Sequence, residues 1–200
     1  MHYEQDNNTS NGKEDIEWLV LEKKGDRIFV ISKYALDCQQ YHTHIFNYDF
    51  SDVDVTWETC FLRKWLNGTF LNAAFTEAEQ AMIPSVTVSA DKNPKYNTEP
   101  GNATQDQVFL LSIPEISKFF SDDSMKQCRG TPYCYAQGAF KDAQNGNCWW
   151  WLRSPGCASN CAVCVTDDGG IFTLGCDVDG KSLSKEGSPA VRPALWIELG

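Results

Sequence analysis

Hydrophobic positions near the start of the chain follow the pattern of two neighbouring extended strands. Two β-type runs, residues 16–21 and 27–31, flank a polar stretch that contains Gly25 and Asp26. Glycine and aspartate favour tight turns because they tolerate the backbone angles that such turns need. The pattern therefore predicts an opening β-hairpin.

Helical spacing replaces this pattern between residues 56 and 75. Four apolar residues stand at i, i+1, i+4 and i+5 and would line one face of a helix: Phe61, Leu62, Trp65 and Leu66. Asn67 and Gly68 follow directly and predict the end of this helix, since both residues are common at helix C-termini.

Cap sequences predict three further helices. Thr76 precedes Glu79 by three residues, which is the capping-box spacing, and Pro84 closes that segment. The run that begins at Ser112 repeats the arrangement with proline in the first turn, and Thr131 begins a short third helix.

The second half of the chain is richer in strand signals. Residues 89–106 are polar and predict a long surface loop of the kind that often carries function, and a strand follows at 108–111. From Trp149 onward, short β-type runs alternate with Gly and Asp, and residues 191–199 predict a final strand. The order of strands, then helices, then strands predicts an α+β fold with a single domain over residues 1–200.

Charge and length narrow the classes of partner. The formal net charge is −10 and the 17 basic residues are scattered, so a nucleic-acid groove and an anionic membrane surface are not expected. No apolar run is long enough to cross a bilayer, and the polar N-terminus does not have the pattern of an export signal. We expect a soluble protein that does not insert into membranes.

Four of the nine cysteines gather in the window Cys157–Gly180. The spacing of Cys157, Cys161 and Cys164 matches that of radical-SAM iron–sulfur ligands. Only 36 residues follow Cys164, however, which is far too few for the barrel of those enzymes. If residues 161–166 form a strand, Cys161 and Cys164 also point to opposite faces. We therefore expect no cluster, and reduced cysteines throughout, because an odd number cannot pair completely.

Other candidate chemistry has simpler explanations. Asp177, Asp179 and Gly180 match only the first positions of a calcium loop, so turn aspartates are expected, with calcium left open. Arg153 and Arg192 stand beside tryptophan-bearing strands and are expected to bond carbonyl or carboxylate groups. Nucleophile-elbow, phosphate-loop and zinc-protease motifs do not occur. We expect no enzyme activity, no cofactor and no metal.

Several segments together resemble an uncharacterised domain family of gut bacteria and their phages, over nearly the whole chain. These segments are Tyr3–Asn7, Ile16–Leu21, Leu62–Asn67, Trp150–Gly156 and Val191–Trp196. The family is similar to C-type-lectin-like and formylglycine-generating-enzyme-like folds. The resemblance implies small mixed or antiparallel sheets, paired terminal strands and short packed helices.

The closing pattern also resembles the variable proteins of diversity-generating retroelements, which display rewritten residues on a lectin-like scaffold. Rewriting the adenines of asparagine codons never yields Trp, Met, Lys, Glu or Gln. The 24 residues of the window contain none of these five types, whereas the other 176 contain 42; uniform composition would give about six in the window.

The resemblance and the loop chemistry predict noncovalent recognition of a protein or glycan surface. The predicted binding residues are Cys157, Ala158, Ser159, Asn160, Cys161, Cys164, Thr166, Asp167, Ile171, Thr173, Cys176 and Asp177. Such a module would lie in the cytoplasm, or on a phage or cell surface through another component.

The formylglycine-generating relatives supply an enzymatic alternative. Those enzymes use a cysteine pair and copper to oxidise a substrate cysteine. The candidate pairs here are Cys157 with Cys161 and Cys164 with Cys176. Metal content distinguishes this alternative from the binding module.

Overall fold

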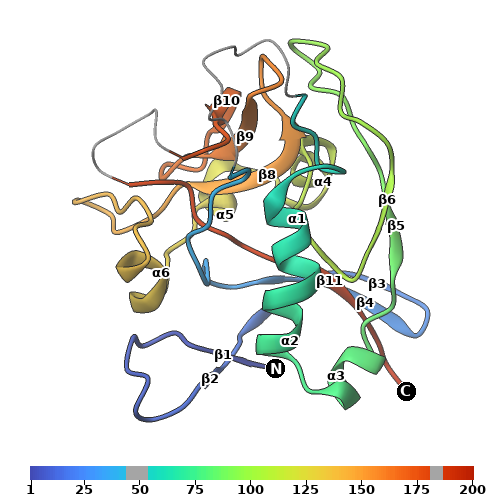
Figure 1. Ribbon diagram of the computed structural model, residues 1–200, viewed down its shortest axis with the longest axis vertical. Coiled ribbons are helices and arrows are strands. Elements are labelled where there is room, and N and C mark those ends of the chain that lie inside the picture. The colour runs from blue at the N-terminus through green and yellow to red at the C-terminus, as the bar shows by residue number, and fades with distance from the viewer. Residues whose placement is uncertain (44–53, 181–186) are drawn as a thin grey trace.

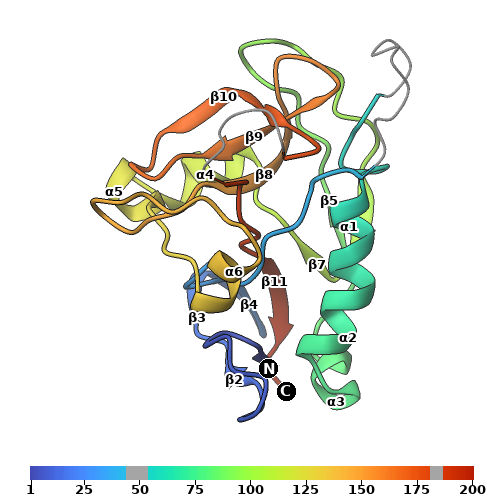
Figure 2. The same cartoon turned by 60° about the vertical axis from the view of Figure 1, so that its left-hand side comes forward.

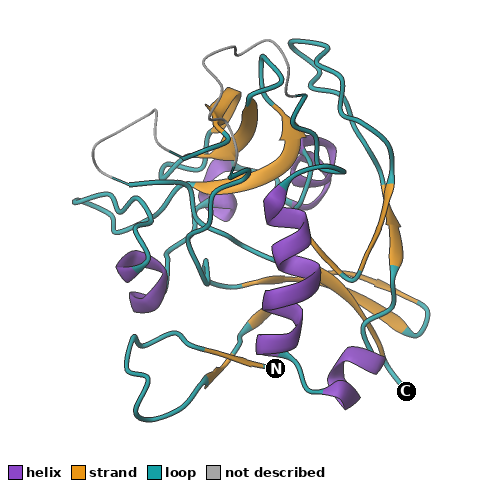
Figure 3. Cartoon of the chain, in the orientation of Figure 1, coloured by secondary structure: helices purple, strands orange, loops and turns teal. Residues whose placement is uncertain are grey.

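The computed structural model describes residues 1–43, 54–180 and 187–200. Small antiparallel sheets and short helices make up these ranges, so the fold is α+β as predicted (Figures 1 and 3). A three-stranded sheet occupies the upper half of Figure 1 and a four-stranded sheet the lower half.

The opening hairpin is confirmed. Strands β3 (Trp18–Lys24) and β4 (Arg27–Ser32) pair antiparallel. Gly25 supplies the turn with a positive φ of 64°, a conformation that costs glycine little. The hairpin forms one side of the four-stranded sheet, whose order is β3-β4-β11-β7.

The final strand β11 (Ala194–Glu198) lies between β4 and β7 (Val108–Phe109). The prediction that the two terminal strands pair is therefore wrong, because the first strand, β1 (His2–Tyr3), pairs with β2 (Glu14–Asp15) instead. Burial explains the difference: β4 buries Phe29–Ser32 and offers a long apolar partner, whereas β1 buries a single residue.

The helix predicted between residues 56 and 75 is present, but its predicted end at Asn67 and Gly68 is wrong. Segment α1 (Phe61–Trp65) passes into a π-helical turn, η1 (Leu66–Phe70), and then into α2 (Leu71–Ala74). The Asn67 amide bonds the carbonyl of Val108 at 2.8 Å and accepts the amide of Gln107 at 2.8 Å. Asn67 thus joins the helix to β7 rather than ending it.

The three helices predicted from caps are confirmed. Capping boxes begin α3 and α4, and the Thr131 hydroxyl caps α6. Asp122 caps one further short helix, which the sequence patterns did not predict. The bounds are α3 Glu77–Ala81, α4 Ile113–Phe119, α5 Asp123–Lys126 and α6 Pro132–Ala136.

The long loop predicted at 89–106 is shorter than expected. Its last residues form β6 (Thr104–Asp106), which pairs with β5 (Val86–Val88). The upper sheet has the order β10-β9-β8. Its strands are β8 (Trp150–Pro155), β9 (Cys161–Val165) and β10 (Ile171–Asp177).

Buried apolar side chains from residue 3 to residue 195 form one hydrophobic cluster. The helical column α1–α2 stands beside the sheets, and α4 and α5 lie close to the upper sheet (Figure 2). Among the helices that the structure describes, none is both long and apolar enough to cross a membrane.

Candidate functional site

Strand β8 is the buried support of the predicted binding window. All of its residues are buried, and Trp150, Trp151 and Leu152 have no exposed surface. The indole of Trp150 donates to the carbonyl of Lys126 at 3.1 Å, and that of Trp151 donates to the carbonyl of Gln39 at 3.1 Å. Both faces of the strand are therefore covered, as predicted.

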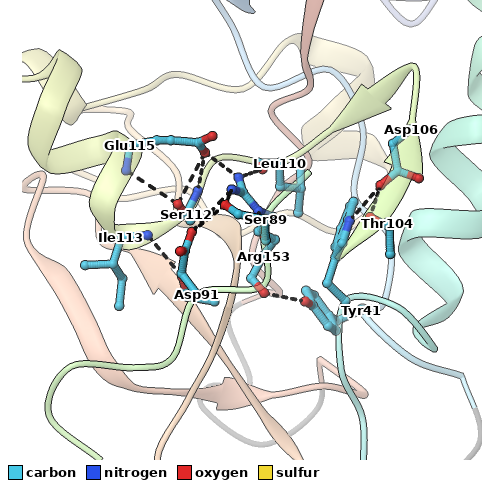
Figure 4. A network of polar contacts seen from close by, with 12 residues as sticks. Tyr41, Ser89, Asp91, Thr104, Asp106, Leu110, Ser112, Ile113, Glu115 and Arg153 are labelled. Atoms are coloured by element: carbon cyan, nitrogen blue, oxygen red, sulfur yellow. Dashed lines mark hydrogen bonds and ion pairs between the residues drawn. The ribbon is translucent and has the colours of Figure 1, made fainter. Parts of the chain in front are cut away.

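Arg153 ties β8 to two neighbouring segments (Figure 4). Its guanidinium donates to the carbonyl of Leu110 at 2.8 Å, to the carbonyl of Ser89 at 3.2 Å and to the Glu115 carboxylate, and it lies 3.6 Å from an oxygen of Asp91. The prediction that this arginine satisfies carbonyl and carboxylate groups is confirmed. The network holds α4 and the start of the 89–103 loop against the strand.

The turn between β8 and β9 forms one end of the window. Gly156 donates to the carbonyl of Cys161 at 2.6 Å, and the amide of Cys157 donates to the carbonyl of Leu174 at 2.8 Å. The Cys161 thiol lies 3.6 Å from a carboxylate oxygen of Asp177. This end of the window therefore brings residues 157–161 next to the end of β10.

The turn between β9 and β10 forms the opposite end. Trp149 donates its indole N–H to Asp167 at 2.8 Å. The hydroxyl of Thr166 donates to Asp168 at 2.5 Å and the amide of Gly170 donates to the same carboxylate at 3.1 Å. These bonds lower the pKa of Asp168, with the Thr166 hydroxyl as the largest cause. The side chains at this end already have partners within the protein.

A β-bulge separates the two ends. The register of β10 against β9 shifts between Phe172 and Cys176. Gly175 has a φ of 85°, and a Cβ there would come within 2.8 Å of the carbonyl oxygen of Ala162. Only glycine fits this position, so the bulge is fixed by the sequence.

The prediction is wrong for two of the twelve binding residues, because they do not lie on the surface. Cys164 is fully buried and Cys176 is 2% exposed, and their side chains contact each other. The other ten are exposed or half-buried: Cys157, Ala158, Ser159, Asn160, Cys161, Thr166, Asp167, Ile171, Thr173 and Asp177.

The sequence pattern predicted a long loop of functional type at 89–106 but not its position beside the window. Asn93 is buried, and its amide donates to the carbonyls of Pro155 and Thr173 at 2.9 and 2.8 Å. Thr98 donates to the carbonyl of Gly156 at 2.7 Å. Exposed residues between them, such as Asn97, lie beside the window. The predicted length of the loop was the signal that could have identified it as part of this surface.

Paired substitutions test the burial difference within the window. Cys164→Asn should lower the free energy of unfolding by about 1–3 kcal/mol, because it places an amide in an apolar site without partners. Cys157→Asn, at an exposed position, should change it by less than about 0.5 kcal/mol. Urea unfolding of the two variants beside the parent measures both values. Equal effects would contradict the placement of Cys164 in the core.

The cysteine geometry does not form a three-ligand site. Cys157 and Cys161 lie together on the turn, while Cys164 is fully buried beside Cys176. Burial raises the pKa of Cys161 to about 12, and the carboxylate of Asp177 adds to this effect. A cluster or zinc site needs thiolates, which this environment disfavours.

Among the residues described, one group of three side chains has ligand atoms close enough to share a cation: Glu4, Asp6 and Glu14. The carboxylate of Glu14 already accepts the amides of Gln5 and Asp6 at 2.7 and 3.3 Å. These hydrogen bonds stabilise the chain around β1 and β2. The three carboxylates alone do not identify a metal site.

Arg192 is a second buried guanidinium. Its Nε donates to the carbonyl of Ser32 at 2.9 Å, as predicted, and its charge lies 4.9 Å from the ring centroid of Trp150. Its Nη1 has no hydrogen-bond partner among the described residues. Burial alone would raise the pKa of Cys128, but a hydrogen bond with Cys148 and the Arg192 charge lower it to about 7.

The Cys128 thiol is therefore expected to ionise near neutral pH in the folded protein. Because folding lowers the pKa of the Cys128 thiol, its ionisation stabilises the folded state at pH values above the ordinary thiol pKa of 9.0. This contribution to stability is lost as the pH falls through about 7. The stability difference between the parent and Cys128→Ser should grow as the pH rises from 7 to 9. Chemical unfolding across this range measures it; a difference independent of pH would contradict the thiolate.

Neither the curated proteins nor the solved structures gave a match. One family model matches residues 10–199, which include both sheets, the window and its flanking tryptophan and arginine strands. The chain therefore belongs to the family described as domain of unknown function DUF6273.

Proposed function

We propose that this protein is a noncovalent recognition module. Its ligand surface comprises the ten accessible window residues together with the neighbouring residues 94–98. The observation that carries this proposal is the contrast between the accessible turns at both ends of the β9–β10 hairpin and the fully buried strand β8, which pairs with β9 in the same sheet. Loops on a rigid support can change their side chains without loss of the core.

The two ends offer different chemistry to a ligand. Residues 157–160 present small side chains and backbone groups, and Asp177 adds a half-buried carboxylate. Between the ends, Leu174 exposes almost half of its surface at the edge of the sheet. A surface of small polar groups around an exposed apolar side chain suits a protein or glycan partner.

The residue composition supports a finer proposal, that this surface is diversified by a retroelement on a C-type-lectin-like scaffold. The five residue types that adenine rewriting cannot produce are missing from the window. Burial restricts the diversified set: Cys164 and Cys176 pack in the core, so random replacement there would destabilise the fold. Such a module would be presented by a partner on a phage or cell surface.

The gene provides the direct test of diversification. A noncoding near-copy of the codons for residues 157–180 should lie near the gene and differ from it mainly at adenines. Sequencing the locus in descendants of one clone should then show substitutions at the accessible positions and none at Cys164 or Cys176. An intact locus without a near-copy, and without such variation, would leave a static binding module.

Binding capacity is tested with displayed libraries. One library randomises the ten accessible window positions, and a matched library randomises exposed positions of β3, including Leu19, Val20 and Lys23. The first library should yield folded, specific binders to a chosen target protein, with substitutions focused on the window. Equal yields from both libraries would contradict a dedicated recognition surface.

A copper-dependent oxidase is the alternative, and one observation favours it: the side chains of Cys157 and Cys161 interact at an accessible turn. The second candidate pair, Cys164 and Cys176, is buried and could not meet a substrate cysteine. The raised pKa of Cys161 fits copper poorly, because copper(I) binds thiolates. Stoichiometric copper that is lost in Cys157→Ser would replace the binding proposal with this one.

A further inference from the structure

A cleft outside the window lies between α6 and residues 141–146; α6 is on the left side of Figure 1. Its volume is about 860 Å³, within the range of small-molecule sites. Arg129, Tyr135 and Lys141 line it together with the polar residues Gln144 and Asn145.

The walls of the cleft are held in place by backbone contacts. The Tyr135 hydroxyl accepts the amide of Gly130 at 2.7 Å and donates to the carbonyl of Gly146 at 2.6 Å, so it joins the two walls. The carbonyl of Arg129 accepts the amide of Ala35 at 3.0 Å. Asp142 accepts the amides of Gln144 and Asn145 at 2.9 and 2.8 Å and shapes the loop. The cleft is therefore preformed.

The charge of the cleft is opposite to that of the protein. The chain carries a net charge of −10, yet two exposed cations line this cleft against a single carboxylate, that of Asp142. Arg129 donates to the carbonyl of Asn145 at 3.2 Å, and the Lys141 ammonium lies 4.9 Å from the ring centroid of Tyr135. In the described part of the chain, neither cation forms an ion pair with a carboxylate. Both remain available to an anionic ligand.

The remaining groups select among anions. Gln144 and Asn145 are exposed beside the cations, and side-chain amides both donate to and accept from hydroxyl groups. The oxygen of the Asn145 side chain already accepts the amide of Asn147 at 2.7 Å and its nitrogen contacts Asp167, so Gln144 supplies the amide for a ligand. Tyr135 adds an aromatic ring, which offers apolar surface to a sugar. Cations alone would bind any anion, but cations with an amide and an aromatic ring favour a ligand that carries both a charge and several hydroxyls.

We propose that this cleft binds an acidic sugar unit, with its carboxylate between Arg129 and Lys141 and its hydroxyls on the side-chain amide of Gln144. Asn145 contacts Asp167, with 3.4 Å between its amide nitrogen and the carboxylate. The cleft therefore adjoins the far end of the window. This proposal rests on the proposed function, because it names the class of ligand that a recognition protein would bind.

Titration with matched small molecules tests the inference on the whole chain. The probes are D-glucuronate, D-glucose, which lacks the carboxylate, and acetate, which lacks the sugar. Glucuronate should bind with a dissociation constant near 1 mM and shift the side-chain amide NMR signal of Gln144. Glucose and acetate should each bind at least about tenfold more weakly.

Two substitutions locate the binding. Arg129→Gln should weaken glucuronate binding about tenfold or more, and Lys141→Gln by several-fold, because each removes one charged hydrogen-bond donor. Both residues are exposed, so melting temperatures should stay close to that of the parent. Lys64→Gln removes an exposed lysine on α1 and should leave binding unchanged.

Three results would overturn the inference. Equal binding of glucose would show that the charge is not recognised, and equal binding of acetate would show that the sugar is not recognised. Full binding by Arg129→Gln and Lys141→Gln would place the ligand elsewhere. None of these measurements uses residues 157–177, so failure of the cleft and failure of the window surface are distinguishable.

Discussion

Trp151→Ala is expected to lower the free energy of unfolding by roughly 3–5 kcal/mol. The side chain is fully buried, and its indole N–H bonds the carbonyl of Gln39. Its ring lies 5.5 Å from that of Tyr41, measured between ring centroids. Alanine would leave a large cavity beneath the window and an unsatisfied carbonyl. Urea unfolding followed by circular dichroism measures the loss.

Two controls separate the cavity from other effects. Trp151→Phe keeps a ring but removes the indole N–H, so its cost should be clearly smaller than that of alanine. Leu174→Ala lies on the same sheet, but its side chain is 46% exposed, so it should change stability by less than about 0.5 kcal/mol. Similar losses for Trp151→Ala and Leu174→Ala would contradict a rigid β8 support.

Elements with local signals were predictable from the sequence. The cap at Thr76 needs only Glu79, and the cap at Ser112 needs only Glu115, so both helix starts follow from residues a single turn apart. The hairpin around Gly25 is equally local. Physical causes that act within a few residues can be read without knowledge of the remaining fold.

Elements decided by distant partners were not predictable. Asn67 and Gly68 form a helix-ending pair by composition, yet the amide of Asn67 finds partners on β7, some 40 residues away in sequence. In the same way, β11 pairs with β4 and β7 rather than with β1 because of burial that only the assembled sheet provides. Tertiary contacts override local preference at both places.

The candidate site shows the same division. The tryptophan strand and the flanking arginine were identifiable from their residue types, whereas the burial of Cys164 and Cys176 depends on how β10 lies against β9. The cleft at Arg129 and Lys141 had no sequence signal, because its two cations are twelve residues apart on segments that the Tyr135 hydroxyl joins. Surfaces built across loops need the structure.

The largest electrostatic effect is expected at Arg153. Its guanidinium is almost completely buried and bonds Glu115 and two backbone carbonyls. Arg153→Met keeps the length of the side chain but should lower the free energy of unfolding by about 3–5 kcal/mol, because it leaves the Glu115 carboxylate without its cationic partner and both carbonyls without the guanidinium donor. Arg27 provides the matched control. Its ion pair with Glu198 is about half exposed, so Arg27→Met should cost less than about 1 kcal/mol.

A double-mutant cycle shows whether the loss at Arg153 comes from the ion pair. Glu115→Gln keeps an oxygen that can still cap α4, but it removes the negative charge that the guanidinium faces. In this background Arg153→Met should cost at least about 1 kcal/mol less than in the parent, because no carboxylate is left uncompensated. Chemical unfolding of the four proteins gives the coupling energy. If the two losses simply add, Arg153 would stabilise the window through its carbonyl bonds and packing alone, and Glu115 would act only as the cap of α4.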